Sequence, residues 1–349
     1  MVSCCHRYHS TSLLTINQRH GTPLLMSLDR FTIPVAQELK EVEAVIQKET
    51  TSEIDLVTTV VQYIIGNGGK RLRPLLTLLA ARMAGSKNLG SPNLAAAMEM
   101  IHTATLLHDD VVDNAPLRRG RPSTKAKWGN QISVLVGDFF WTKASEMVVR
   151  HGDLKILEVI TRAINTTTEA EILEITKHND CAIDEEIYIQ IIRGKTAVLL
   201  SACAQIGAIL GKVSEPFEEA LRRYGMDLGI AFQLTDDRLD YNGDEEKFGK
   251  KKGGDFREGK MTLPLIIALK NSDTEEQQKI KDAFLADKLD PKQFKEITAI
   301  IQKYDGLKKT QELARTFADR AKENLTPFKP SLEKESLLGL ADYSVEREI

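Results

Sequence analysis

Residues 95–114 read AAAMEMIHTATLLHDDVVDN, a stretch that joins an apolar helical pattern to a charged triplet. Its apolar residues recur at three- and four-residue spacing with little strict alternation, which is typical of an α-helix. On a helix, Asp109 and Asp113 lie on one face about one turn apart, so their carboxylates point the same way. The stretch therefore predicts a helix that carries a carboxylate pair near its end.

The same helical spacing recurs through most of the chain. It is found in residues 94–112, 131–149, 155–177, 186–211 and 217–241. No proline occurs between residues 122 and 216, an interval that alternating strands and turns would rarely tolerate. We therefore predict an all-α bundle of long helices.

The prediction for domain organisation is one domain over residues 29–349. This range has no fixed-period repeat or low-complexity linker, although residues 242–259 form a Gly- and Lys-rich loop between two helical stretches. Residues 1–28 contain no acidic residue before Asp29 and are rich in Ser, Thr and His, so we interpret them as an extension outside the fold. An organellar transit peptide in residues 1–25, for a mitochondrion or plastid, is the alternative to a cytoplasmic protein.

Composition excludes several function classes. The 47 basic and 50 acidic residues give a net charge of −3, so no global field favours nucleic acid or anionic lipid. The four cysteines lack the spacing of a zinc site or of a secreted disulfide framework. No stretch approaches the roughly 18 uncharged apolar residues of a membrane span. We expect a soluble protein with at most peripheral membrane contact through an apolar product.

A second acidic triplet, in FQLTDDRLDY, repeats the spacing of the first. The six carboxylates are Asp109, Asp110, Asp113, Asp236, Asp237 and Asp240. For one such triplet a solvated helix face would be the ordinary interpretation. Each triplet here interrupts an apolar run, however, and burying carboxylates without a counter-charge is costly, so we expect a cation between facing helices.

The ligand chemistry indicates which cation to expect. Oxygen-only ligands favour a hard ion such as Mg²⁺, with Mn²⁺ as a substitute, and Mg²⁺ usually bridges one or two carboxylates to substrate phosphates. A diphosphate is then the expected ligand. An EF-hand around Asp240 lacks a correctly placed glycine and glutamate. Gly194-Lys195-Thr196 resembles the end of a P-loop, but Ile189 stands where its first glycine should be.

Basic residues gather near both triplets. Lys70, Arg71 and Arg73 lie at the predicted start of a helix, where free backbone N–H groups also favour an anion. Further candidates along the chain are Arg118, Arg119, Lys195, Lys250 and Lys260. Any one of them alone would be an ordinary solvated cation. Together they indicate two anion pockets.

Five motifs occur in one order: GGKRLRP, LLHDDVVDNAPLRRG, GKT, FQLTDD and GKKKGGDFREGKMTLP. They resemble the trans-isoprenyl (polyprenyl) diphosphate synthases over nearly all of residues 30–349, with Lys251 where that family often has proline. The resemblance implies the isoprenoid synthase fold, a homodimer of long helices around a central cavity. It also implies a Mg²⁺-dependent prenyltransferase that adds isopentenyl diphosphate to an allylic diphosphate, such as farnesyl diphosphate, by successive 1′-4 condensations.

The resemblance also implies a role for each matching residue. The six aspartates would hold Mg²⁺ against the allylic diphosphate. The same diphosphate would be bound by Arg118, Lys195 and Lys250, and Lys260 is a further substrate-binding candidate. Isopentenyl diphosphate would be bound by Lys70, Arg71, His102 and Arg119, with Thr196 and Gln233 lining the reacting centre.

Product length is expected to depend on the residues before Asp109. Ala104 precedes it by five residues, about 7.5 Å of helical rise, at a level where family members with short products commonly carry a bulky aromatic residue. Ile101, Met98 and Ala97 would form a deeper floor. The ending LADYSVEREI resembles that of bacterial octaprenyl to decaprenyl diphosphate synthases, which make quinone side chains. We therefore expect a medium- or long-chain product.

Three other functions are compatible with parts of this pattern. A synthase of farnesyl or geranylgeranyl diphosphate would share every motif. A terpene cyclase would share the fold but would not need an isopentenyl site, which Lys70, Arg71 and Arg119 provide. A non-catalytic partner subunit would usually lack one aspartate triplet, whereas both are present.

Overall fold

The computed structural model describes residues 28–66, 68–87, 90–242, 252–286 and 290–347. Lys250 and half of the predicted loop, residues 243–251, lie outside these ranges. The predicted extension also lies outside them apart from Leu28. The division into an extension and one domain therefore stays a prediction.

Helices account for most of the described chain, which confirms the all-α prediction. In chain order the elements are α1 (Asp29–Thr32), η1 (Ile33–Val35), α2 (Ala36–Glu49), α3 (Asp55–Gly66), α4 (Leu72–Met83), α5 (Ser91–Val112), β1 (Leu117–Arg118), β2 (Arg121–Pro122), α6 (Thr124–Trp128), α7 (Asn130–His151), α8 (Leu154–Thr176), α9 (Glu185–Ile192), η2 (Arg193–Ala197), α10 (Val198–Leu210), α11 (Glu215–Asn242), α13 (Gly254–Arg257), α14 (Leu263–Asn271), α15 (Thr274–Phe284), α16 (Pro291–Lys303), α17 (Gly306–Asn324) and α18 (Leu332–Glu346). The strands β1 and β2 form a minimal antiparallel hairpin in which Arg118 pairs with Arg121.

Two predicted elements need correction. Residues 186–211 are not one α-helix, because the five-residue π-helix η2 separates α9 from α10. Within the predicted loop 242–259, Gly254–Arg257 form the short helix α13. The other four predicted helices correspond to α5, α7, α8 and α11.

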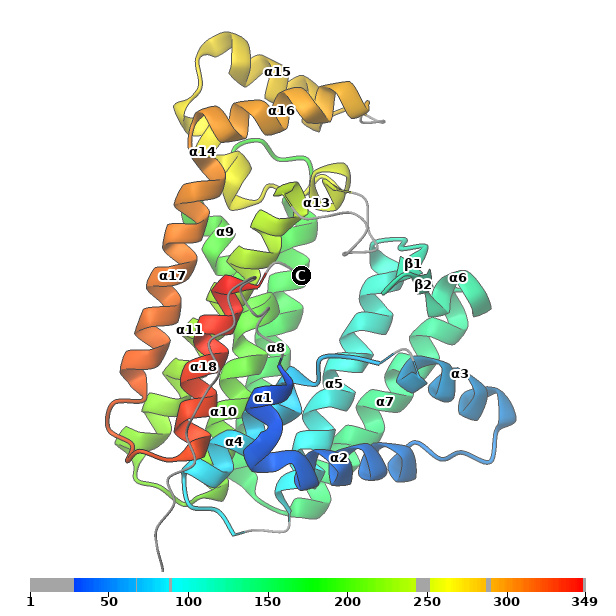
Figure 1. Cartoon of the computed structure of the whole chain (residues 1–349). Helices are drawn as coiled ribbons and strands as arrows, with labels where there is room; N and C mark the ends of the chain where they lie inside the picture. The colour runs from blue at the N-terminus through cyan, green and yellow to red at the C-terminus, as the bar shows by residue number, and fades with distance from the viewer. Residues whose placement is uncertain (1–27, 67, 88–89, 243–251, 287–289, 348–349) are drawn as a thin grey trace, which may run out of the picture.

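The helices that carry the two triplets belong to a bundle of long helices. Figure 1 shows α5, α7, α8, α10 and α11 running alongside one another, with α17 and α18 on one side and α15 and α16 across one end. The helix α10 is apolar around most of its circumference and largely buried, as expected at the centre of a bundle. A glycine lets its neighbour α11 approach: a Cβ at Gly225 of α11 would lie 2.5 Å from the Leu200 carbonyl oxygen of α10.

The segment Glu185–Leu210 is an exception to the expectation that no stretch is apolar enough to cross a membrane. It has 26 residues, and its most apolar window has a mean hydropathy of 1.3. Most of that window, 61%, is buried inside the protein. The segment therefore fits the core helix of a bundle, and its apolar character follows from its central place.

Candidate active site

The first triplet lies at the end of α5, and its three carboxylates have different surroundings. Asp110 is only 2% exposed and accepts hydrogen bonds from Arg118 Nε at 2.8 Å and Nη2 at 2.6 Å. Asp113 Oδ2 lies 3.3 Å from Lys260 Nζ. The carboxylate of Asp109 forms no hydrogen bond to another residue that the structure describes. Burial, reinforced by the nearby Glu171, raises the pKa of Asp109 to about 7.

The second triplet lies near the end of α11, and each of its three carboxylates contacts another part of the protein. Asp236 pairs with Arg347 Nη2 at 2.7 Å. Asp237 accepts hydrogen bonds from Tyr188 Oη at 2.5 Å and Gln233 Nε2 at 2.7 Å, and burial raises its pKa to about 7. Asp240 accepts hydrogen bonds from the backbone N–H groups of residues 254 and 255, at 3.0 and 3.2 Å. The second triplet thus also fixes the start of α13 and the end of α18.

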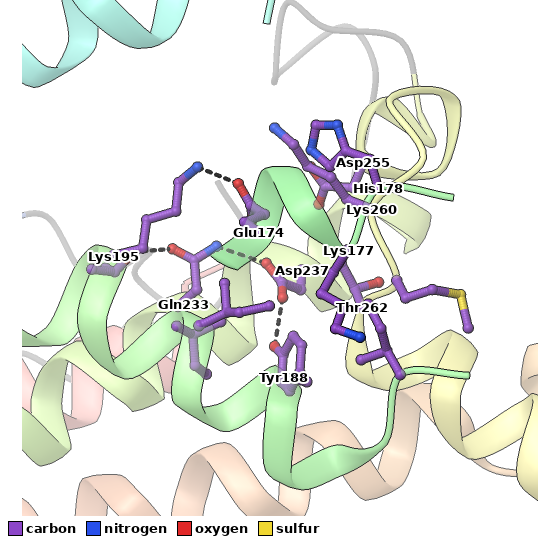
Figure 2. Close-up of a pocket in the computed structure, with 15 residues that line it drawn as sticks. Glu174, Lys177, His178, Tyr188, Lys195, Gln233, Asp237, Asp255, Lys260 and Thr262 are labelled. Carbon is purple, nitrogen blue, oxygen red and sulfur yellow. Dashed lines mark hydrogen bonds and ion pairs between the residues drawn. The ribbon is translucent and has the colours of Figure 1, made fainter. Parts of the chain in front are cut away.

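A hydrogen-bonded chain links η2 to the second triplet. Thr196 Oγ1 donates to Gln233 Oε1 at 2.8 Å, and the amide of Gln233 donates in turn to Asp237. Figure 2 shows Gln233, Asp237 and Tyr188 joined in this way. The structure therefore brings Thr196 and Gln233 together beside the aspartates, as predicted for residues that line one centre.

Lys195 is held by two carboxylates. Its Nζ lies 2.8 Å from Glu171 Oε2 and 2.5 Å from Glu174 Oε2. Burial alone would lower the pKa of Lys195, but the two carboxylates raise it, so the ammonium stays charged. A cavity of about 100 Å³ opens between this pair and the second triplet. Its lining includes Lys195, Thr196, Gln233, Asp237 and Lys260.

A second, smaller cavity of about 60 Å³ is lined in part by α5 and gathers other predicted residues. Its polar lining includes Arg71, His102, Asp110, Arg118 and Arg119. Burial and the surrounding arginines hold the pKa of His102 well below its usual range, so this imidazole is neutral at pH 7. The cavity therefore presents guanidinium groups and one neutral imidazole, a set that suits a diphosphate.

Carboxylates orient the guanidinium of Arg71 at this cavity. Its Nε and Nη2 donate to Glu43 at 2.5 and 3.2 Å, and its Nη1 donates to Glu99 at 3.0 Å. Arg119 packs over Gly69, where a Cβ would lie 2.9 Å from the guanidinium. The lack of a side chain at Gly69 therefore makes room for the guanidinium of Arg119.

Lys70 lies apart from its sequence neighbour Arg71. Its Nζ lies over the ring of Tyr343, 5.8 Å from the centroid, and Asp236 and Arg347 are its electrostatic neighbours. Burial and the charge of Arg347 lower the pKa of Lys70. Lys70 thus faces the second triplet, whereas Arg71 faces the smaller cavity.

The residues predicted to set the product length have different surroundings. Ala104 and Met98 are fully buried, while Ile101 lines a cavity of about 150 Å³ between α5, α7 and α8. The rest of its lining is mostly apolar and includes Trp141, Leu157, Ile160 and Ile164. Five residues correspond to about 140° around a helix, so Ala104 does not share the face of Asp109.

The described residues contain no group of three or more His, Cys, Asp or Glu side chains that could by itself hold a metal ion. The chain's own cations, Arg118, Lys260 and Arg347, neutralise three of the aspartates. This arrangement still fits Mg²⁺, because that ion commonly takes only one or two carboxylates and completes its shell with phosphates and water. The donor set therefore suits an ion that arrives with a diphosphate.

Sequence reasoning missed several residues of the site, notably Glu171, Glu174, Tyr188 and Arg347. The spacing of Glu171 and Glu174 was a usable signal, because residues three apart share a helix face. Tyr188 and Arg347 carry no local signal, since only the tertiary fold brings them to α11.

Comparisons with known proteins show which family and fold the chain is similar to. The family model described as polyprenyl synthetase matches residues 54–301. The chain is 40% identical to the octaprenyl diphosphate synthase of Escherichia coli over 327 residues, which cover 93% of this chain and all of that protein. The crystal structure of a polyprenyl synthase from Caulobacter crescentus, complexed with calcium and isoprenyl diphosphate, covers 94% of this chain and all of its own, with 40% identity and a TM-score of 0.89. A decaprenyl diphosphate synthase from Rhodobacter capsulatus covers 92% of this chain and 99% of its own, with 39% identity and a TM-score of 0.88.

Proposed function

The chain belongs to the polyprenyl synthetase family and is a prenyltransferase with the all-α isoprenoid synthase fold, and from this we propose that it makes a medium- or long-chain trans-polyprenyl diphosphate. The observation that carries the proposal is a pair of separate cavities that each contain cationic side chains, Lys195 and Lys260 in one and Arg71, Arg118 and Arg119 in the other. A condensation of two diphosphates needs two anion sites beside one reacting centre.

The larger polar cavity is the proposed site of the allylic diphosphate. Lys195 and Lys260 supply charge that is already in place when the carbon–oxygen bond ionises. Thr196 and Gln233 lie at the same cavity and orient the reacting end of the substrate. Lys250 is assigned to this diphosphate from its motif alone, because it lies outside the described residues.

The smaller cavity is the proposed site of isopentenyl diphosphate. Arg71 and Arg119 would each offer planar donor pairs to the phosphate oxygens. His102 is held neutral and adds a further donor without added charge. Arg118 links this cavity to the first triplet, because it lines the cavity and pairs with Asp110, which lines it too.

We assign the metal to the carboxylates that remain accessible, Asp109 and Asp113 on α5 and Asp236 and Asp240 on α11. Mg²⁺, when bound, would neutralise the charge that develops on the departing diphosphate. Asp110 and Asp237 are more engaged with the protein, so their main task is to hold Arg118 and Gln233. The released diphosphate is the proposed acceptor of the proton lost in each condensation.

The cavity at Ile101 favours a long product. Ile101 precedes Asp109 by eight residues, about 12 Å of helical rise, which corresponds to two to three isoprene units of about 5 Å each. Apolar space continues from there along α8. A quinone side chain made by a cytoplasmic enzyme is the use that this length suggests.

A homodimer is the proposed assembly. Large apolar side chains are exposed on α7 and α8, among them Leu135 at 62% and Ile172 at 57%. A second copy that covered these helices would remove this surface from water.

The decisive experiment combines purified protein with labelled isopentenyl diphosphate, farnesyl diphosphate and Mg²⁺, followed by sizing of the products. We expect products longer than geranylgeranyl diphosphate, loss of turnover in EDTA, and recovery with excess Mg²⁺. Products that stop at farnesyl or geranylgeranyl length would assign the chain to the short-chain synthases. A cyclic hydrocarbon would assign it to the terpene cyclases.

Product length can be tested at two positions. Ile101→Phe should shorten the product, because the ring would enter the cavity below the aspartates. Ala104→Phe tests the expectation from sequence and should also shorten the product if that position borders the chain. If it only overpacks the core, it should instead cost about 1–3 kcal/mol and lower the yield at every length. Unchanged products from both active variants would contradict the proposed tunnel.

A further inference from the structure

Two glutamates of α8 share one lysine at the edge of the active site. Glu171 and Glu174 lie three residues apart and therefore on one helix face. Both contact Lys195 Nζ, at 2.8 and 2.5 Å, and Figure 2 shows the contact with Glu174. The lysine is thus held by the protein at the place where the proposed function needs it for a diphosphate.

Close backbone packing between η2 and α8 positions the lysine and the two glutamates. A Cβ at Gly194 would lie 2.5 Å from Ala170 Cβ, so only glycine lets η2 come this near to α8. Thr167 Oγ1 donates to the Gly194 carbonyl oxygen at 3.2 Å and fixes the contact. The neighbouring Lys195 then reaches both glutamates across a distance that α8 and η2 set.

The same glutamates act on both sides of the site. Glu171 contributes, after burial, to the raised pKa of Asp109, and Glu174 is the main carboxylate that raises the pKa of Lys260. This region holds more carboxylates than ammonium groups. The carboxylates are Asp109, Asp113, Glu171 and Glu174, and the ammonium groups are those of Lys195 and Lys260. The cluster therefore remains short of positive charge.

We propose that Glu171 and Glu174 are positioning residues that hold Lys195 at rest and release it to the diphosphate, after which their carboxylates accept hydrogen bonds from water bound to the metal. The exchange breaks no covalent bond, because the ammonium only replaces carboxylate oxygens with phosphate oxygens. Carboxylates next to metal-bound water strengthen metal binding. The inference rests on the proposed function only in taking a metal diphosphate as the ligand.

The first test measures binding without turnover. The full chain is titrated calorimetrically with inorganic diphosphate and Mg²⁺, and the variant Glu171→Gln/Glu174→Gln is compared with Glu169→Gln, an exposed neighbour on α8. We expect about tenfold weaker binding in the double variant and no change in the control. Binding within twofold of the original protein in the double variant would overturn the proposal.

The second test follows Lys195 itself by the rate at which an amine-reactive reagent modifies it, read by mass spectrometry. In the original protein the rate should be low with or without Mg²⁺ and diphosphate, because one partner or the other always covers the ammonium. In the double variant it should rise several-fold and fall again when Mg²⁺ and diphosphate are added. A rate that rises but does not fall again would show that Lys195 does not pass to the diphosphate, and an unchanged rate would show that the glutamates do not cover it; either result would refute the inference.

The outcomes separate this proposal from the proposed function. Failure of the original protein to bind Mg²⁺ and diphosphate at all would count against the function. Normal binding with no response to the double variant would count only against the role of the glutamates. If circular dichroism shows that the double variant does not fold, Glu174→Gln alone is measured, because it removes the shorter of the two contacts.

Discussion

The two aspartate triplets share one spacing in the sequence but differ in what surrounds them. In each, the middle aspartate is buried and bound by its own partners, Arg118 for Asp110 and Tyr188 with Gln233 for Asp237. The outer positions differ. The carboxylate of Asp109 has no hydrogen bond within the described part of the chain, whereas that of Asp236 is paired with Arg347. The first triplet therefore keeps one carboxylate available for a ligand, whereas the second triplet also connects α11 to the residue that follows α18.

The largest expected effect is on turnover, in variants of the first aspartate of each triplet. Asp109→Ala and Asp236→Ala should each reduce turnover by about a hundredfold or more, because each removes a proposed metal ligand. Only Asp236→Ala should also lower the free energy of unfolding, by about 2 kcal/mol, because it leaves the buried Arg347 without its carboxylate. Assays of turnover and chemical denaturation check both parts. Near-normal turnover in either variant would contradict the site assignment.

The middle aspartates should differ in stability. Asp110→Asn removes a charged pair with Arg118 and should cost roughly 2–3 kcal/mol. Asp237→Asn should cost about 1 kcal/mol, because burial already favours the neutral carboxyl and an amide can still accept from Tyr188. Urea denaturation of the metal-free proteins measures the two costs. Equal costs would show that the two buried positions are equivalent.

Proton binding should affect both triplets when metal is absent. Asp109 and Asp237 have pKa values raised from 3.8 to about 7, so between these values the folded state binds more protons than the unfolded state. The free energy of unfolding should therefore fall as the pH rises from about 4 to 7, by up to about 1.4 kcal/mol per pH unit and group. Asp109→Asn should make the curve shallower. A curve that rises over this range in the metal-free protein and is unaffected by Asp109→Asn would exclude the raised pKa.

The smallest expected effect is at Tyr188. Tyr188→Phe removes one donor from Asp237 and should cost about 1 kcal/mol of stability and less than tenfold in turnover. Tyr224→Phe is the matched control, because its hydroxyl donates to the Leu337 carbonyl oxygen at 2.7 Å and does not contact the aspartates. It should cost similar stability while turnover stays normal. A turnover loss shared by both variants would mean that Tyr188 acts only through stability.

The spacing of apolar residues predicted the helices that carry both triplets, because the apolar residues of α5 and α11 lie on the faces that these helices bury. It could not predict which carboxylate meets which cation. Arg118 is eight residues from Asp110 and Arg347 is more than a hundred from Asp236, and neither distance along the chain reveals the contact. Lys70 and Arg71 show the same limit, because adjacent residues before a helix point in different directions. Arg71 adopts a left-handed backbone conformation with φ of 48°, which no spacing rule predicts.

The π-helix η2 makes the register of α10 relative to α9 sensitive to insertion and deletion. Such a segment adds a residue to a turn, so α10 is rotated by about 100° relative to a continuous helix through α9. Deleting one residue between Arg193 and Ala197 would let the helix run on without interruption. The apolar face of α10 and the side chains of Lys195 and Thr196 could then no longer both keep their present directions. Substitutions in this segment keep its length. An insertion or deletion would instead misplace either the apolar face of α10 in the core or the side chains of Lys195 and Thr196 at the proposed site.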